Sequence, residues 1–324
     1  MLPYDQQQFI QDSVAVVPSG HWPQRFERAI AQATEVVIAS QHKVDSLNEV
    51  FYEYSYRILH GLAKVRATQL NTDLMPLTVW NQQPGDGFGG TSSAVHYWQQ
   101  WSETVAVIDL NALLAARRPV DLGAALNPVT AIAPAPTATL EPDDFNPELR
   151  AMLFADVVNF THLREDQFPA FVQHFLGTVA HLAAVSAHAP LFQNTWGDAL
   201  YFVFASVRDA GIFALDLCDL MQTGQWQTKG LPADLNLRIA LHAGPVVRHR
   251  NPITGHENYI GSHVNHTARI EPITPPGKVY ASQAFAALAS STNVSTFTCD
   301  YVGKTPYAKQ YGTFPTYHVC RRRT

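Results

Sequence analysis

A proline-, alanine- and threonine-rich stretch over residues 125–149, "ALNPVTAIAPAPTATLEPDDFNPEL", constrains the fold more than any other feature. Its prolines cannot continue a helix or a sheet ladder, and it shows neither helical nor alternating apolar spacing. Such a composition is typical of a semi-extended linker. The 324 residues are therefore expected to divide into an N-terminal domain over residues 1–124 and a C-terminal domain over residues 150–324. Two domains also fit a chain of this length.

The N-terminal domain alternates helix and strand signals, which predicts an α/β fold with a parallel, Rossmann-like sheet. Residues 85–90, "GDGFGG", match the G-x-G-x-x-G dinucleotide pattern, and Asp109 follows about 20 residues later. Four residues, "NQQP", separate these glycines from the preceding strand, which favours a flexible loop with Thr91 as a helix N-cap. The expected strands cover 34–40, 74–80 and 104–110, and the expected helices 22–33, 44–70 and 91–101.

The C-terminal domain has a different rhythm, in which long helical patterns separate short strands. This order predicts an α+β fold with a mostly antiparallel sheet and helices on one side. Leu235, Leu237, Ile239 and Leu241 alternate with other residues, so we expect one buried and one solvated face for their strand. The expected strands are 151–158, 199–205, 234–244, 278–282 and 313–319, and the expected helices 168–185, 206–221 and 263–271.

Composition and charge exclude several classes of protein. The formal net charge is −5, whereas nucleic-acid binders usually carry a basic stripe, so we expect no nucleic-acid partner. The N-terminus lacks a basic region followed by an apolar stretch, and we find no apolar run of roughly 18 residues. We therefore expect neither a signal peptide nor a membrane span. Three irregularly spaced cysteines do not fit a disulfide framework, which favours a cytoplasmic location.

Two aspartates stand in otherwise apolar strands. Asp156 lies within "LFADVV", and Asp198 follows a glycine and precedes "ALYFVF". Burying a lone carboxylate costs several kcal/mol, so each must be wet, paired or metal-bound. If the two strands are neighbours, the two carboxylates would bind Mg²⁺ together with substrate phosphates. Alternatively, each aspartate caps a turn or a helix.

Four motifs occur in order: "FADVVNFT", "NTWGDALY", "LRIALHAGPV" and "IGSHVNHTAR". Together they resemble the catalytic domain of class III nucleotidyl cyclases, the adenylate and guanylate cyclases, over about residues 150–320. The resemblance implies a ferredoxin-like catalytic core that works as a homodimer. It also implies conversion of a nucleoside triphosphate to the 3′,5′-cyclic monophosphate and pyrophosphate. Glycine-rich segments like residues 85–90 precede some bacterial cyclase domains, in regions that look like Rossmann-like or TIR-like regulatory modules.

The resemblance implies a role for each matching residue. Asp156 and Asp198 match the aspartates that bind two Mg²⁺ or Mn²⁺ ions. Asn265 matches the residue that orients the ribose, and Arg269 the one that stabilises the transition state. The two are four residues apart, hence on one face of a helix. Lys309, in "AKQYGTFPTYHV", matches a lysine that pairs with the terminal phosphates, and the amides of Val158, Asn159, Phe160 and Thr161 match the turn around the β- and γ-phosphates.

In such a dimer the metals come from one subunit, and Asn265, Arg269, Lys309 and the base contacts from the other. The two base-contacting positions hold Asn194 and Asn258. Adenylate cyclases typically have lysine followed by aspartate or threonine there, and guanylate cyclases glutamate followed by cysteine. An amide can satisfy either purine edge, and the absence of glutamate favours ATP. GTP and a pyrimidine triphosphate stay open, as does a catalytically silent nucleotide-binding module that signals by dimerising.

Overall fold

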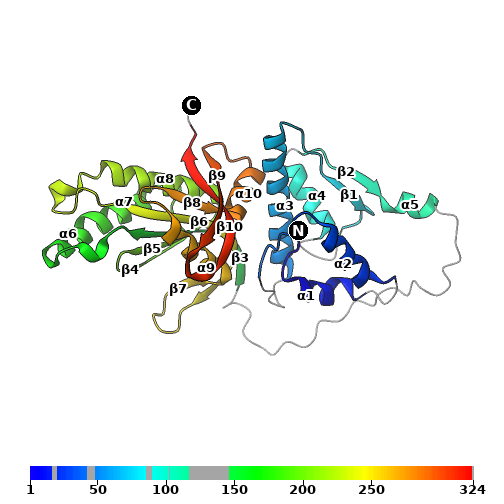
Figure 1. Ribbon diagram of the computed structural model, residues 1–324, viewed down its shortest axis with the longest axis horizontal. Helices are drawn as coiled ribbons and strands as arrows, with labels where there is room; N and C mark the ends of the chain where they lie inside the picture. The colour runs from blue at the N-terminus through cyan, green and yellow to red at the C-terminus, as the bar shows by residue number, and fades with distance from the viewer. Residues whose placement is uncertain (17–19, 42–47, 85–89, 102, 117–145, 323–324) are drawn as a thin grey trace.

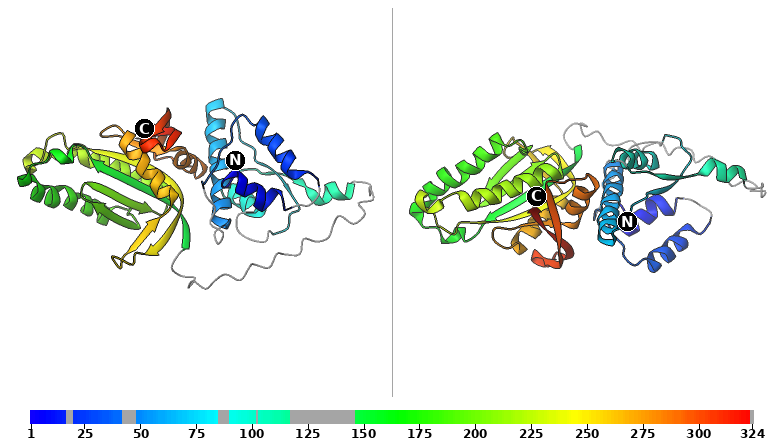
Figure 2. Two further views of the ribbon diagram at one scale, coloured as in Figure 1. Left: turned by 60° about the horizontal axis from the view of Figure 1, so that its bottom comes forward. Right: turned by 90° about the horizontal axis from the view of Figure 1, so that it is seen from above.

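The computed structural model describes residues 1–16, 20–41, 48–84, 90–101, 103–116 and 146–322. Figure 1 and Figure 2 show two parts, with the long helix α3 standing at the boundary between them. Most of the predicted linker and the glycines at 85–89 lie outside the described residues. The strand that opens the C-terminal domain begins at Asn146, so residues 146–149 belong to a strand and not to a linker.

The N-terminal part is mainly helical. Its only sheet in the described residues pairs β1 with β2 in parallel. Its helices and strands are α1 (Gln6–Phe9), the π-helical turn η1 (Ile10–Val14), α2 (Trp22–Gln32), α3 (Asn48–Leu70), β1 (Leu77–Trp80), α4 (Thr91–Gln100), β2 (Ala106–Asp109) and α5 (Leu110–Ala116).

The Rossmann-like sheet predicted for this part is not confirmed. Parallel sheets are normally covered on both faces, but Leu77 and Val79 of β1 are 61% and 54% exposed. The expected strand at 34–40 makes only an isolated bridge between Leu2 and Ile38. The segment ends at Ser40, which is buried and forms a hydrogen bond with His263 of the C-terminal domain. Tertiary packing therefore overrides the strand signal here.

The C-terminal domain is built on a sheet in the order β4-β5-β3-β6-β8-β10-β9, with β7 paired to β6. Its pairs are antiparallel except β6–β8, so the prediction of a mostly antiparallel sheet is confirmed. The strands are β3 (Asn146–Val157), β4 (Phe192–Trp196), β5 (Ala199–Phe204), β6 (Leu237–Arg250), β7 (Glu257–Ile260), β8 (Val279–Ser282), β9 (Phe297–Tyr307) and β10 (Gly312–Arg321).

Helices pack on both faces of this sheet. One face, with Leu153 of β3 and Leu241 of β6, is covered by α7, α8 and α10. The helix α9 packs instead on the opposite face, beside Met152 and Phe154. The helices are α6 (Phe168–Ala170), η5 (Phe171–Leu176), α7 (Gly177–Val185), α8 (Val207–Thr223), α9 (Ser262–Ile270) and α10 (Gln283–Ser291), with short 3₁₀ turns η3 (Phe160–His162), η4 (Glu165–Gln167), η6 (Trp226–Lys229), η7 (Glu271–Ile273) and η8 (Ala308–Gln310).

Two expectations about these elements need correction. Strand β6 was expected to be solvated on one face, but it is buried on both faces from Ile239 to Val246 because α9 covers the second face. No apolar run long enough to cross a membrane was expected. The helical stretch Glu165–Val185 nevertheless has the length and mean hydropathy, 1.3, of such a segment. Phe171, Phe175 and Val179 of that stretch pack into the core on the sheet face that α7, α8 and α10 cover.

The two parts meet where α3 crosses α10. Gly61 of α3 lies so close to Ala287 of α10 that a Cβ there would stand 1.8 Å from the Ala287 carbonyl oxygen. Only glycine allows this approach. The Tyr54 hydroxyl of α3 also donates to the Ala243 carbonyl of β6 at 2.7 Å. The N-terminal part is therefore joined to the central strand of the C-terminal sheet.

Candidate active site

The β4–β5 hairpin brings Asp198 next to Asp156. Trp196 pairs with Ala199, which leaves Gly197 and Asp198 as a two-residue turn. Gly197 has φ of 69°, a left-handed conformation that such hairpin turns require and that glycine adopts freely. Ala199 in turn pairs with Asp156 on β3. The turn therefore sets Asp198 beside Asp156, on the face of the sheet away from α7 and α8.

The two carboxyl groups interact strongly. The pKa of Asp156 is raised to about 6, mainly by burial and also by the charge and hydrogen bond of Asp198, while the Arg238 guanidinium opposes the rise. A carboxylate pair of this kind binds protons because its negative charges are not fully compensated. A divalent cation would supply that compensation with the oxygen ligands it prefers, so these residues fit a Mg²⁺ or Mn²⁺ site. The described residues hold no group of three or more His, Cys, Asp or Glu side chains arranged for a metal.

Arg238 and Glu271 complete this cluster, although the sequence analysis did not single them out. Arg238 of β6 is the cross-strand neighbour of Asp156. Its Nε lies 3.6 Å from Oε1 of Glu271, which begins the turn after α9. The pKa of Glu271 is raised to about 7, mainly by burial and also by the charge of Asp156, while Arg238 opposes the rise. The sequence does contain an indication of this pair, because Arg238 lies within the apolar run "LRIAL" and a charged residue in a buried strand needs a partner of opposite charge.

The turn after β3 has the geometry of an amide cradle. Asn159 adopts a left-handed φ of 61°, and the 3₁₀ turn η3 follows it. Successive amides in such a turn can point at one anion. The Val158 amide, however, already donates to the Asn236 carbonyl at 2.9 Å. A phosphate at this turn would therefore meet the amides of Asn159, Phe160 and Thr161.

Helix α9 and the turn η8 carry the other predicted catalytic residues. Asn265 is exposed and Arg269 half-buried on α9, while His263 and Thr267 anchor the helix in the core. Lys309 in η8 is exposed and has φ of 58°. Among the described residues, no hydrogen bond or ion pair joins Asn265, Arg269 or Lys309 to the aspartate pair. One chain thus presents two separate sets of predicted catalytic residues.

A model of the adenylate and guanylate cyclase catalytic domain matches residues 148–318, more than half of the chain. The chain belongs to this cyclase family. The family recognised from the four motifs is therefore confirmed, and residues 148–318 are called the cyclase domain below.

Solved cyclase structures are similar to this domain. The guanylate cyclase domain of RhGC from Catenaria anguillulae, solved with GTP, is 22% identical, with a TM-score of 0.48. The match covers 55% of this chain and 100% of that one. The adenylyl cyclase CyaB from P. aeruginosa is 16% identical, with a TM-score of 0.48 and coverage of 56% and 97%. No curated protein sequence matches the chain.

The two positions predicted to contact the base lie on different strands of the cyclase domain. Asn194 is on β4 and Asn258 on β7, and both are half-buried. Each Oδ1 accepts a hydrogen bond from the next backbone amide, Thr195 N at 2.9 Å and Tyr259 N at 2.8 Å. The Nδ2 amino group of each asparagine takes no part in this local hydrogen bond, and it can donate hydrogen bonds to a ligand.

An exposed aromatic side chain stands next to Asn194 and the aspartate pair. Trp196 is 54% exposed, yet its ring stacks on Tyr201, with 6.0 Å between ring centroids. Tyr201 stacks in turn on Phe154 at 4.6 Å. The three rings lie on the same sheet face as Asp156. The cyclase domain thus carries a rigid apolar surface beside its carboxylates.

A second buried polar cluster lies beneath α9. His242 Nδ1 lies 2.6 Å from Ser282 Oγ, and His242 Nε2 lies 2.8 Å from His263 Nδ1. His263 Nε2 continues the chain to Ser40 Oγ at 3.0 Å. Burial lowers the pKa of His263 to about 3, so the ring is neutral. Both ring nitrogens of His242 thus have partners within the protein, which gives His242 a structural role in packing.

Proposed function

We propose that this chain is a nucleotidyl cyclase that converts ATP to 3′,5′-cyclic AMP and pyrophosphate in a homodimer. One observation carries the proposal. Asp156 and Asp198 form a carboxylate pair on the sheet face that also bears α9, yet Asn265 and Arg269 of the same chain make no bond with that pair. A second copy would bring its α9 to the first copy's carboxylates and complete two equivalent sites.

Each predicted residue then has a chemical task. Asp156 and Asp198 would hold two Mg²⁺ or Mn²⁺ ions. The ions would lower the pKa of the ribose 3′-hydroxyl and neutralise negative charge on the phosphates. Asn265 would orient the ribose, and Arg269 would meet the negative charge that develops on the phosphoryl oxygens. Lys309 and the amides of Asn159–Thr161 would hold the β- and γ-phosphates. Positioning and electrostatics suffice, since the attacking group belongs to the substrate.

The open face beside the aspartates supports the homodimer. Trp196 offers a large ring that is already held in place by stacking, so its burial would cost little side-chain entropy. Ile260, at the end of β7, adds a second exposed apolar side chain, 45% exposed. Exposed apolar surface next to an incomplete polar site is typical of a protein–protein interface.

The choice of ATP rests on Asn194 and Asn258. Neither position carries the glutamate that would accept from the N1–H and amino group of guanine. With each Oδ1 held by a neighbouring amide, each side chain offers donors to acceptor atoms of the base. Acceptors also occur on guanine and on pyrimidines, so guanylate and pyrimidine cyclase activities are the alternatives.

The test is incubation of the purified chain with ATP, GTP, CTP and UTP, each with Mg²⁺ and with Mn²⁺. Cyclic products are identified by mass spectrometry. We expect 3′,5′-cyclic AMP as the main product. Cyclic GMP or a cyclic pyrimidine nucleotide would refute the assignment of the base and leave the metal chemistry standing. Nucleotide binding without any product would favour a silent, dimerising module.

Complementation tests the shared site. The Asp198→Ala and Arg269→Ala variants should each be inactive as homodimers. When they are mixed, each heterodimer keeps one site in which both the carboxylates and the arginine are intact. We expect up to half of the wild-type activity per heterodimer. If heterodimers form and no activity returns, the shared-site arrangement is wrong.

We further propose that the chain acts in the cytoplasm, with no nucleic-acid or membrane partner. The odd number of cysteines and the net charge of −5 support this assignment. Fractionation of cells that express the chain, followed by detection in soluble and membrane fractions, tests it. Recovery with the membrane would direct attention to the apolar stretch Glu165–Val185.

A further inference from the structure

A cavity of about 550 Å³ lies between the N-terminal helices and the cyclase domain. Arg57 of α3 and Trp101, just after α4, form one wall. The opposite wall consists of Arg150 on β3 and Arg208 at the start of α8. Its volume is within the range of small-molecule sites, which is roughly 300–1,000 Å³. The predicted catalytic residues do not line it.

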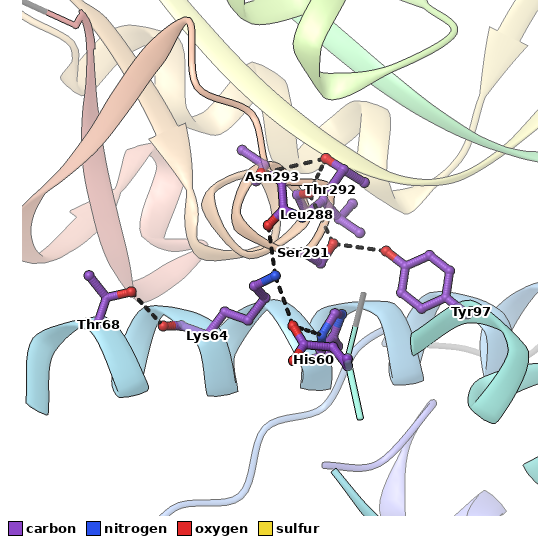
Figure 3. Close-up of polar contacts among 10 residues, drawn as sticks. His60, Lys64, Thr68, Tyr97, Leu288, Ser291, Thr292 and Asn293 are labelled. Carbon is purple, nitrogen blue, oxygen red and sulfur yellow. Dashed lines mark hydrogen bonds and ion pairs between the residues drawn. The ribbon is translucent and has the colours of Figure 1, made fainter. Parts of the chain in front are cut away.

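Specific contacts hold the two walls together. Figure 3 shows His60 and Lys64 on α3 facing the end of α10. The Lys64 ammonium donates to Asn293 Oδ1 at 2.7 Å and pairs with Glu103 at 2.9 Å. Tyr97 of α4 shares a hydrogen bond of 3.0 Å with Ser291. The cavity is therefore part of a built interface.

The lining of the cavity is positively charged. It includes three arginines, and no carboxylate occurs among the described residues that line it. Arg57 and Arg150 each form an ion pair with a glutamate outside the lining, Glu53 and Glu148. These pairs leave the Nε–H of both arginines free. Arg208 forms no ion pair with any described residue, so the cavity keeps an excess of positive charge.

Two guanidinium donors on residues that line this cavity are buried and lack a hydrogen-bond acceptor. They are Nε of Arg57 and Nε of Arg150. A buried donor without an acceptor is destabilising, and more so when it is charged. The hydrogen-bonding capacity of both arginines is therefore not fully used by the described residues. An anion inside the cavity would interact with the charge of their guanidinium groups.

The start of α8 adds a further anion-binding element. This helix is 17 residues long, and the Ser206 side chain caps it by accepting from the Asp209 amide. The amides of Val207 and Arg208 lie in the first turn, where helical amides have no partner within the helix. Their partial positive charge favours an anion at this end. Ser206, Val207 and Arg208 all line the cavity.

We propose that this cavity binds a small phosphorylated molecule. Guanidinium groups recognise phosphate oxygens through paired hydrogen bonds, and three of them match a group with two or more negative charges. Leu149, Leu288 and Val294 also line the cavity and provide apolar contact for the rest of the ligand. The site lies outside the proposed active site, so its ligand would be an effector and not the substrate.

The position of the cavity connects this ligand to catalysis. Arg150 and Asp156 lie on the same strand, β3, and Arg57 lies on the helix that docks on α10. A phosphate held by both arginines would tie the N-terminal part to the strand that carries the predicted metal ligand. We therefore expect the ligand to change the cyclase rate, an effect that rests on the proposed function.

Binding is tested by isothermal titration of the full chain with inorganic phosphate and with pyrophosphate. EDTA is present, so that binding through metal ions at Asp156 and Asp198 does not contribute. The wild type should bind pyrophosphate, and Arg57→Gln or Arg150→Gln should weaken binding about tenfold or more. Arg66→Gln, an exposed arginine on the same helix α3, is the matched control and should bind as the wild type does. Equal affinity in all four proteins would overturn the proposal.

Hydrogen exchange of the wild type keeps the proposal testable if an arginine variant does not fold. Pyrophosphate should slow exchange in peptides that contain Arg150 and the first turn of α8, again in EDTA. Protection confined to the turn Asn159–Thr161, or no protection at all, would show that the cavity is not the site. Both experiments measure ligand binding and not catalysis, so they test the cavity even if the chain produces no cyclic nucleotide.

Discussion

Two polar clusters, one buried beneath α9 and one half-buried at the end of β3, differ in how their charge is balanced. The histidine cluster beneath α9 is a hydrogen-bonded chain from Ser40 to Ser282, and burial keeps its rings neutral. The carboxylate cluster at the end of β3 sets Asp156, Asp198 and Glu271 around a single arginine, Arg238.

This difference in charge balance distinguishes polar groups that stabilise the fold from polar groups that take part in function. A neutral cluster whose hydrogen bonds are satisfied stabilises one arrangement of the chain and needs nothing from outside. A cluster with uncompensated like charges costs stability unless it binds protons or a cation. The first is therefore expected to matter for folding and the second for catalysis.

Removing one carboxylate should have the largest effect. Asp156→Asn takes away a predicted metal ligand and also relieves repulsion with Asp198. We expect cyclase activity to fall roughly 10³-fold, since metal ions contribute several kcal/mol to such reactions. The thermal unfolding midpoint without metal should stay the same or rise. A variant that loses both activity and stability would contradict the contrast between the two clusters.

Removing a ring from the histidine cluster should mainly affect folding. His263→Ala leaves a cavity and unpairs Ser40 and His242, so we expect a loss of about 2–4 kcal/mol in unfolding free energy. Urea unfolding followed by circular dichroism measures it. Unchanged stability together with lost activity would give this cluster the functional role instead.

The ion pair beside the aspartates should tune metal binding. In Glu271→Gln the Arg238 guanidinium loses its charged partner, and it is then expected to turn to Asp156 and compete with the cation. We expect roughly tenfold weaker Mn²⁺ binding without nucleotide, measured by electron paramagnetic resonance. Glu257→Gln, which opens the exposed pair with Arg248, is the control and should leave Mn²⁺ affinity unchanged.

Replacing Arg238 in the same background separates competition from a general disturbance. If the arginine competes with the cation, Arg238→Met should restore Mn²⁺ binding when it is combined with Glu271→Gln. A double variant that binds as weakly as Glu271→Gln alone would show that the competition does not occur.

The two clusters should respond oppositely to pH, with the smallest effect of the series. The pKa of His263 is lowered to about 3, and that of His266, whose ring centroid lies 4.4 Å from that of His242, to about 4. Their stabilising contribution is therefore present above pH 6.5 and is lost as pH falls. The pKa of Asp156 is raised to about 6 and that of Glu271 to about 7, so their contribution is lost as pH rises through 6–7.

These two contributions partly cancel between pH 5 and pH 7. The double variant Asp156→Asn, Glu271→Gln removes the carboxylate contribution and leaves that of the histidines. Its unfolding free energy should therefore fall more steeply on acidification than that of the wild type. Urea unfolding at pH 5, 6 and 7 measures both slopes, and a flatter profile in the variant would reverse the assignment.

Local sequence patterns determined much of this protein. Helical spacing predicted the helices that became α2, α3, α4, α8 and α9, and Ser206 caps α8 as its sequence context indicates. The order of short strands separated by long helical patterns after residue 150 predicted a mostly antiparallel sheet. A carboxylate is costly inside an apolar strand, and because that cost depends on residue type alone, the sequence marks Asp156 and Asp198 as candidate site residues.

Tertiary structure decided what depends on partners far apart in the chain. The run at 34–40 has a strand composition, but it found no neighbouring strand and lies instead along the cyclase domain. Arg238 and Glu271 are 33 residues apart and became neighbours only when β6 and the end of α9 met. The cavity lined by Arg57, Arg150 and Arg208 likewise unites α3, β3 and α8. Sequence periodicity reports which face of an element is buried, whereas only packing determines which other element covers it.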